Sequence, residues 1–126
     1  PRLVIAMNHA TPLSWIPAMA LLSTEYVKAG GGDRIPRGIA DKWFYSNPLT
    51  EKVAEYITQS KKPQDFKQII ESFKEADRTD LVLMPEGANT FFGSADELQE
   101  FRSTRFIEIA IRSQAPILIV AHKGSE

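Results

Sequence analysis

The sequence predicts a three-layer α/β fold, in which helices flank a mainly parallel sheet. Three short apolar runs, at residues 3–7, 80–84 and 117–120, have the length and composition of buried parallel strands. Segments with helical patterns separate these runs along the chain. Strands that alternate with helices are typical of βαβ crossovers, which place successive strands in parallel in one sheet.

Length and composition are those of one globular domain. The chain has 126 residues, 43% of them hydrophobic and 25% charged, which is enough to bury a core. The net charge is -1 and acids and bases are interleaved, which argues against a nucleic-acid-binding face. The absence of cysteine excludes disulfides and thiol nucleophiles. The two histidines, His9 and His122, lie in no metal-binding spacing, so we expect no structural metal site.

The longest apolar stretch, Trp15 to Leu22, is too short to span a bilayer and contains Pro17. The chain starts on a strand-like run and stops soon after another. We therefore expect a single domain over residues 1–126, trimmed from a longer chain whose other segments could include membrane anchors.

The sequence of the first third of the chain predicts a helix followed by a short strand. Ser14 is a suitable N-cap for a helix over about Trp15 to Ala29, and the run Gly30 to Gly32 ends it. Residues 39–45 predict a short strand and a turn, with three aromatic side chains directed into the core.

Three further helices are predicted. Asn47-Pro48 is a cap followed by proline at the first helical position. That helix is expected to stop near Tyr56, where the sequence is compatible with helix or strand. A capping box, Ser94 to Glu97, precedes a helix that should run to about Arg112. A helix that starts at Pro63 has one apolar face, formed by Phe66, Ile69, Ile70, Phe73 and Ala76.

Two predicted strand ends carry side chains suited to catalysis. The first strand runs into Asn8-His9, and the second runs into Pro85-Glu86-Gly87. Catalytic groups often lie on such loops, because the strands hold them rigidly. An imidazole can accept a proton near neutral pH, a glutamate can accept a hydrogen bond from a hydroxyl, and a glycine lets backbone approach a ligand. The alternatives are a polar residue that closes a strand and an acid that caps a turn.

The order of these landmarks resembles that of the PlsC-like lysophospholipid and glycerolipid acyltransferases. The shared blocks are a strand leading into Asn-His-x-Thr at residues 8–11, Pro-Glu-Gly at 85–87, a Phe-containing helix, and Ala-Pro-Ile-Leu-Ile-Val at 115–120. No block is specific alone, but together they follow the family order from Leu3 to about Gly124. The resemblance implies a glycerolipid acyltransferase-like fold.

The resemblance also implies an activity, the transfer of a fatty acyl group from acyl-CoA or acyl-ACP to a hydroxyl or amine of a lysolipid-like acceptor. His9 would be the general base, with no covalent enzyme intermediate and no cofactor besides the acyl donor. Asn8 and Thr11 would orient the loop or the substrate, and Glu86 and Gly87 would bind the acceptor's polar head. The expected location is the cytoplasmic face of a membrane, peripheral or anchored by segments outside this chain, with no nucleic-acid partner.

The chain departs from the family pattern at the motif's aspartate, which falls on Ser14. A carboxylate there fixes the imidazole tautomer and stabilises the imidazolium. In the serine-protease analogue, a neutral replacement costs about four orders of magnitude in rate. Ser14 can orient the ring by a hydrogen bond without supplying charge, or it can act only as a helix cap.

Expected basic residues are missing as well. The family's Thr-Arg after Pro-Glu-Gly is Ala88-Asn89 here, and the arginine expected near residues 58–62 is replaced by Lys61 and Lys62. These lysines could supply point charges to a phosphate, or they could form a solvated pair. Arg34, Arg37 and Lys42 are further basic candidates, and His122 is interpreted as incidental. Two functions follow from these observations: an acyltransferase, or a catalytically impaired module that binds lipid or an acyl carrier.

Overall fold

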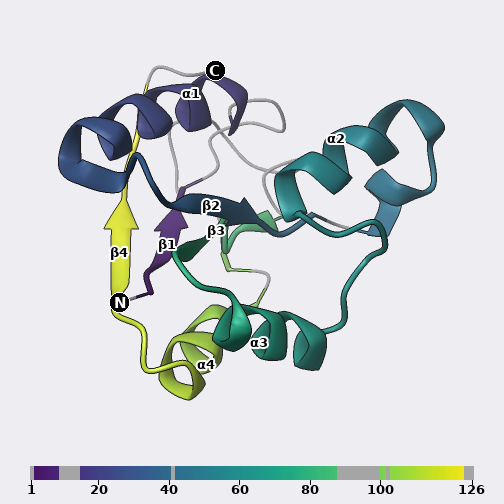
Figure 1. Ribbon diagram of the computed structural model, residues 1–126. Coiled ribbons are helices and arrows are strands. Elements are labelled where there is room, and N and C mark those ends of the chain that lie inside the picture. The colour runs from purple at the N-terminus through teal and green to yellow at the C-terminus, as the bar shows by residue number, and fades with distance from the viewer. Residues whose placement is uncertain (1, 9–14, 41, 88–99, 102, 124–126) are drawn as a thin grey trace.

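A parallel sheet of four strands forms the centre of the computed structural model (Figure 1). The structure describes residues 2–8, 15–40, 42–87, 100, 101 and 103–123. The strand order is β2-β3-β1-β4. All three neighbouring pairs are parallel. The strands are β1 (Val4–Met7), β2 (Ile35–Gly38), β3 (Thr79–Leu83) and β4 (Ile117–Val120).

Helices lie on both sides of the sheet, so the chain is a mixed α/β fold consistent with three layers (Figure 1). In Figure 1, α3 and α4 lie below the sheet, and α1 and α2 lie above it. The helices are α1 (Trp15–Tyr26), α2 (Pro48–Thr58), α3 (Phe66–Glu75) and α4 (Arg105–Arg112). The prediction of parallel strands flanked by helices is therefore confirmed.

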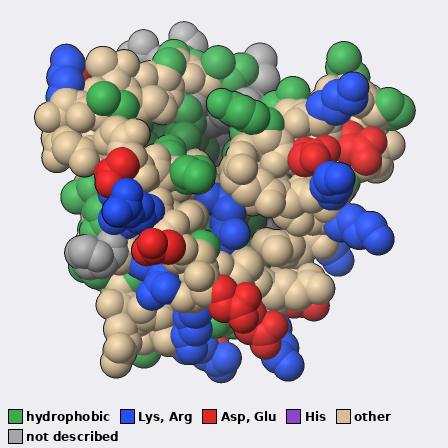
Figure 2. Space-filling model, in the orientation of Figure 1, with side chains coloured by type: hydrophobic (Ala, Val, Ile, Leu, Met, Phe, Trp, Pro, Cys, Tyr) green, Lys and Arg blue, Asp and Glu red, His purple; other side chains and the backbone are tan. Residues whose placement is uncertain are grey.

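The main hydrophobic core lies between the sheet and the helices α3 and α4. Both faces of β1 are buried, as expected for the inner strand of a parallel sheet covered on both sides. The side chains of this core are Val4, Ala6, Ile70, Phe73, Leu81, Phe106, Ile109, Ala110 and Ala115. On the surface, acidic and basic side chains are interspersed, and neither sign forms a continuous patch on the face shown in Figure 2.

The glycine-rich end of the first predicted helix and the start of the second are confirmed. α1 continues into a π-helical segment, Val27–Gly31, in which Gly30 has a left-handed φ of 97°, so glycine ends this helix as expected. Asn47 caps α2 by accepting a hydrogen bond from the Leu49 N–H. α2 is helical through Thr58, which decides between helix and strand at that point.

Two predicted helices begin later than the sequence suggested. α3 begins at Phe66 and not at Pro63, because Asp65 and Gln68 form a reciprocal capping box. α4 begins at Arg105, and the described residues between 100 and 104 are not helical, so a continuous helix from Ser94 is wrong. The capping box expected at Ser94 lies outside the described residues.

The strand and buried aromatics predicted at residues 39–45 are also wrong. The strand is β2, four residues earlier, where it pairs with β3. Gly38 then passes so close to α2 that a Cβ atom there would lie 2.5 Å from Ile57 Cγ2. The chain turns into a 3-10 helix, Lys42–Tyr45, in which Trp43 is 62% exposed.

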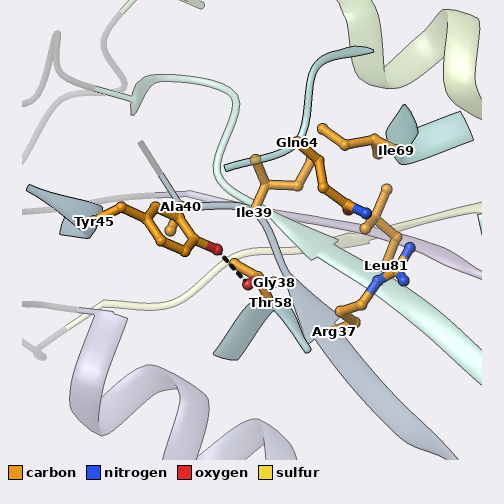
Figure 3. Close-up of a pocket in the computed structure, with 9 residues that line it drawn as sticks. All are labelled: Arg37, Gly38, Ile39, Ala40, Tyr45, Thr58, Gln64, Ile69 and Leu81. Carbon is orange, nitrogen blue, oxygen red and sulfur yellow. Dashed lines mark hydrogen bonds between the residues drawn. The ribbon is translucent and has the colours of Figure 1, made fainter. Parts of the chain in front are cut away.

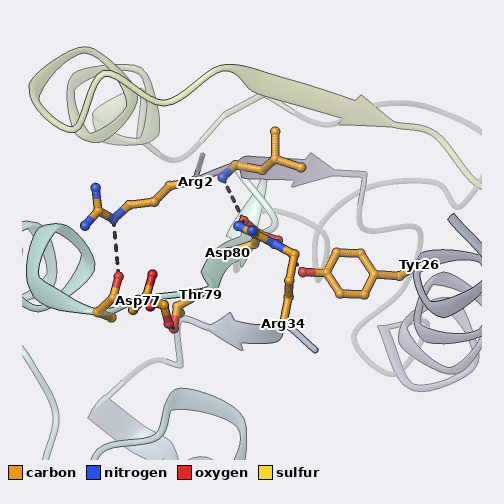
Figure 4. A network of polar contacts seen from close by, with 8 residues as sticks. Arg2, Tyr26, Arg34, Asp77, Thr79 and Asp80 are labelled. Carbon is orange, nitrogen blue, oxygen red and sulfur yellow. Dashed lines mark hydrogen bonds and ion pairs between the residues drawn. The ribbon is translucent and has the colours of Figure 1, made fainter. Parts of the chain in front are cut away.

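Hydrogen bonds to a buried carboxylate join four segments at the edge of the sheet where the strands begin (Figure 4). The Asp80 side chain is fully buried and accepts two hydrogen bonds from Arg34, at 2.8 and 2.5 Å. It also accepts hydrogen bonds from the Leu3 N–H at 2.8 Å and from the Tyr26 hydroxyl. These bonds join β3 to β1, to the end of α1 and to the segment that enters β2.

The network shifts the acidity of its members. Burial and the hydrogen bond to Asp80 raise the pKa of Tyr26 to about 12, because a phenolate beside a carboxylate is unfavourable. Burial alone would raise the pKa of Asp80, but the hydrogen bonds from Arg34 and Tyr26 outweigh it and lower that pKa below its usual value. The hydrogen bond to Asp80 raises the pKa of Arg34.

Replacement of Asp80 should destabilise the fold strongly. Asp80→Asn is expected to lower the free energy of unfolding by about 3 kcal/mol, since it leaves a partly buried guanidinium without its counter-charge. The matched control is Asp33→Asn, which breaks the exposed ion pair with Arg78 and should cost less than about 1 kcal/mol. Urea unfolding at pH 7 measures both, and equal losses would contradict the importance of the buried pair.

Stability should also decline in alkali through Tyr26. Folding raises the pKa of this phenol, so its contribution is complete below the unfolded value of 10 and is lost as the pH rises towards about 12. Tyr26→Phe has no proton to lose and should show a smaller decline over that range. Thermal unfolding midpoints from pH 9 to 12 give the comparison, and parallel curves for the two proteins would refute the assignment.

Candidate functional site

Three chain segments meet where the strands end, which we call the carboxyl edge of the sheet. Parallel strands all end on the same edge, and β1 lies between β3 and β4. Asn8, which follows β1, therefore has neighbours on both sides: residues 84–87 after β3 and residues 121–123 after β4. Ligands of open parallel α/β sheets commonly bind outside the carboxyl ends of the strands.

Asn8 and His122 form a bridge of three hydrogen bonds between the ends of β1 and β4. Asn8 Nδ2 donates to the His122 carbonyl at 2.9 Å, and the His122 N–H donates to Asn8 Oδ1 at 2.7 Å. The His122 ring completes the bridge, with Nε2 2.7 Å from the Asn8 carbonyl oxygen. Since a carbonyl can only accept, Nε2 carries the proton in this contact. The bridge fixes the backbone at the residue immediately before His9.

His122 is thus more than the incidental residue that the sequence suggested. It lies two residues beyond Val120, and Val120 pairs with Met7 in the sheet. Asn8 and His122 consequently leave the sheet at the same level. The sequence alone does not reveal that Asn8 and His122 are neighbours, because their contact depends on the pairing of β1 with β4.

Glu86 brings a buried carboxylate to the same edge. Only 1% of the residue is exposed. It lies in a turn closed by a hydrogen bond from the Gly87 N–H to the Met84 carbonyl at 3.1 Å. Gly87 has a left-handed φ of 53°, a conformation that glycine adopts at little cost. Because β3 and β1 are neighbours, the segments that hold Glu86 and Asn8 leave the sheet side by side.

The other predicted site residues do not gather at this point. His9, Thr11 and Ser14 lie outside the described residues, so only chain connectivity relates them to Asn8. Lys61 and Lys62 are exposed in the connection between α2 and α3, and their ammonium groups make no hydrogen bond or ion pair within the described part of the chain. This connection belongs to the β2 side of the sheet, away from β1 (Figure 1).

Other basic residues also lie away from the ends of β1 and β4. Arg34 binds Asp80 at the opposite edge of the sheet, so the structure assigns it to the fold. Arg105 begins α4 and lies over the Phe66 ring, with Cζ 5.1 Å from the ring centroid. Arg37 is buried in β2 beside a small cavity.

Two general features of the described residues bear on partners. No three of their His, Asp and Glu side chains lie close enough together to hold a metal ion. None of the described helices has both the length and the apolar character needed to cross a bilayer.

The chain matches no known family model, and no curated protein or solved structure is significantly similar to it. A function has to be argued from the residues at the carboxyl edge and from the sequence pattern around them.

The Asn8–His122 bridge should behave as one unit. Asn8→Ala is expected to lower the free energy of unfolding by about 2 kcal/mol, because it removes the side-chain partners of the His122 N–H and carbonyl. His122→Ala removes one hydrogen bond and should cost about 1 kcal/mol. The double variant should lose less than the sum, by at least about 0.5 kcal/mol. Urea unfolding of the four proteins closes the cycle, and strict additivity would show that the two side chains act independently.

Proposed function

We propose that this protein is an acyltransferase that moves a fatty acyl group from a thioester of coenzyme A or acyl carrier protein to a hydroxyl or amine of a lipid-like acceptor. The observation that carries the proposal is the adjacency of two strand ends. Asn8, which immediately precedes His9, and the buried Glu86 follow neighbouring parallel strands. Two of the four blocks that carry the sequence resemblance therefore begin side by side at the ends of neighbouring strands.

The proposed reaction is a direct transfer. His9 takes the proton from the acceptor hydroxyl as its oxygen forms a bond to the thioester carbonyl carbon. The tetrahedral intermediate then collapses, the carbon–sulfur bond breaks, and the leaving thiolate takes the proton back from the imidazolium. Backbone N–H groups of the two loops would stabilise the oxyanion.

The proposal gives Glu86 an electrostatic role. The imidazolium formed on His9 needs a nearby negative charge, and the family places an aspartate at the position of Ser14. Glu86 is the buried acid that follows the strand next to β1. Charges interact more strongly where water is excluded, so a buried carboxylate can act on the imidazolium without touching it. Gly87 lets the backbone of this turn approach the acceptor.

The expected activity can be measured as release of free thiol. The purified protein is incubated with acyl-CoA and a panel of lysolipid acceptors, and release should depend on the acceptor. His9→Ala should slow it about 10²- to 10⁴-fold, the range that a general base contributes. Glu75→Gln, a change of an exposed acid at the end of α3, is the control and should leave the rate unchanged. Unchanged turnover of His9→Ala would remove His9 from the mechanism.

A second candidate function is an acyltransferase-like module that binds lipid or an acyl carrier without turnover. The serine at position 14 and Ala88-Asn89 after Gly87 favour it, because each replaces a family residue that carries charge or a donor fork. Binding of acyl-CoA without thiol release above background would select this module. Ser14→Asp separates the two: it should raise the rate of an enzyme limited by the missing carboxylate, and it cannot create turnover where other essential groups are missing.

A further inference from the structure

Arg37 is a buried guanidinium that no acid neutralises within the described part of the chain. It is the third residue of β2, opposite Leu81 of β3, and only 8% of it is exposed. Its one hydrogen bond among the described residues runs from Nη2 to the neutral Ser72 Oγ of α3, at 2.9 Å. Burial lowers the pKa of Arg37, because the charged form loses its hydration.

Three other arginines among the described residues are paired with acids. Arg34 pairs with Asp80, Arg78 with Asp33, and Arg112 with Glu108. Buried charges in proteins are normally paired in this way, since an isolated one is costly. A guanidinium has five N–H donors, and Ser72 accepts one of those of Arg37. An anionic ligand would satisfy the remaining donors of Arg37 and neutralise its charge.

A small cavity opens beside Arg37 where β2 ends (Figure 3). Its volume of about 20 Å³ is room for one oxygen-sized group. Polar side chains of Tyr45, Thr58 and Gln64 line it together with Arg37, and none of the described residues that line it is acidic. The Tyr45 hydroxyl lies 2.6 Å from Thr58 Oγ1. The Gln64 side-chain amide makes no hydrogen bond within the described residues, so it is a second donor without an acceptor.

Two lysines lie in the chain segment that joins Thr58 and Gln64, two of the residues that line this cavity. Within the connection between α2 and α3, Ser60 and Gln64 bound a stretch of five residues, and the Ser60 carbonyl oxygen lies 3.3 Å from the Tyr45 hydroxyl. Lys61 and Lys62 lie between them, exposed, and these five residues include no acid.

We propose that Arg37 and this cavity form a phosphate-binding site. One phosphate oxygen enters the cavity and accepts hydrogen bonds from the Arg37 guanidinium and the Gln64 amide, while the other oxygens stay in the mouth near Lys61 and Lys62. A phosphate suits this arrangement better than a carboxylate, because its charge and its several oxygens can engage cations from more than one direction. The site does not depend on acyl transfer, and the phosphate can belong to a soluble molecule or to a lipid headgroup.

The test measures how phosphate affects the thermal unfolding midpoint, with sodium chloride of equal ionic strength as the reference. The wild-type midpoint should rise with phosphate concentration, since a ligand that binds only the folded state stabilises it. Arg37→Met should weaken the apparent affinity at least tenfold and should not lower the midpoint in chloride, because it removes an unpaired buried charge. Arg112→Met, at an exposed arginine of α4, controls for the general effect of phosphate as a salt and should keep the full response.

A second variant keeps the test decisive if Arg37→Met does not fold. Gln64→Leu leaves the charge in place and should weaken the phosphate response several-fold. An equal phosphate response in wild type and in the folded variants would overturn the proposal, and so would a wild type that shows no response to any phosphate source.

Two arms separate the sources of the phosphate. A midpoint shift with inorganic phosphate and with glycerol phosphate assigns the site to soluble ligands. Arg37-dependent binding to phosphatidylcholine vesicles that contain phosphatidic acid, without a shift by soluble phosphates, assigns it to a lipid headgroup.

Discussion

The parallel pairing of β1 with both β3 and β4 is the constraint on which the rest of the structure depends. It satisfies the backbone of β1 on both sides and buries both of its faces. It also fixes where the polar residues go, because parallel strands deliver everything that follows them to one edge. Asn8 and His122 are 114 residues apart in the chain and yet exchange three hydrogen bonds. Only the strand order brings them together.

Buried charges have different surroundings at the edge where the strands begin and at the carboxyl edge. At the edge where strands begin, Asp80 is surrounded by the Arg34 guanidinium, the Tyr26 hydroxyl and a backbone N–H, so burial is compensated within the described residues. At the carboxyl edge, Arg37 is buried against a neutral serine and a cavity. A charge left without a protein partner reduces stability, and such costs are concentrated where a protein binds ligands. The contrast favours the carboxyl edge as the place of function.

Local patterns of the sequence predict most of the fold, and long-range order accounts for what they miss. β1 and β4 are apolar runs, β3 ends in the apolar residues Leu81-Val82-Leu83, and Asn47-Pro48 marks a helix start that the structure confirms. β2 is missed because Ile35-Pro36-Arg37-Gly38 lacks an apolar run, and the structure shows why it tolerates proline: β2 is an edge strand. The segments that hold Asn8 and Glu86 lie side by side because β1 and β3 are neighbours, and the order of the strands could not be predicted from the sequence. The roles of His9, Thr11 and Ser14 stay predictions, because these residues lie outside the described part of the chain.

The proposed general-base reaction connects the serine at position 14 with the buried acid Glu86. General-base catalysis creates a cation on the imidazole, and the proposed reaction proceeds only if that charge is compensated in the transition state. A serine can supply a hydrogen bond but no charge, so the proposed reaction needs another acid for this compensation. The buried Glu86 follows the neighbouring strand, and a carboxylate shielded from water acts over a longer range than one on the surface. We therefore expect an acid that follows the adjacent strand to replace, in part, an acid on the histidine loop. Such a replacement is possible because neighbouring parallel strands end side by side.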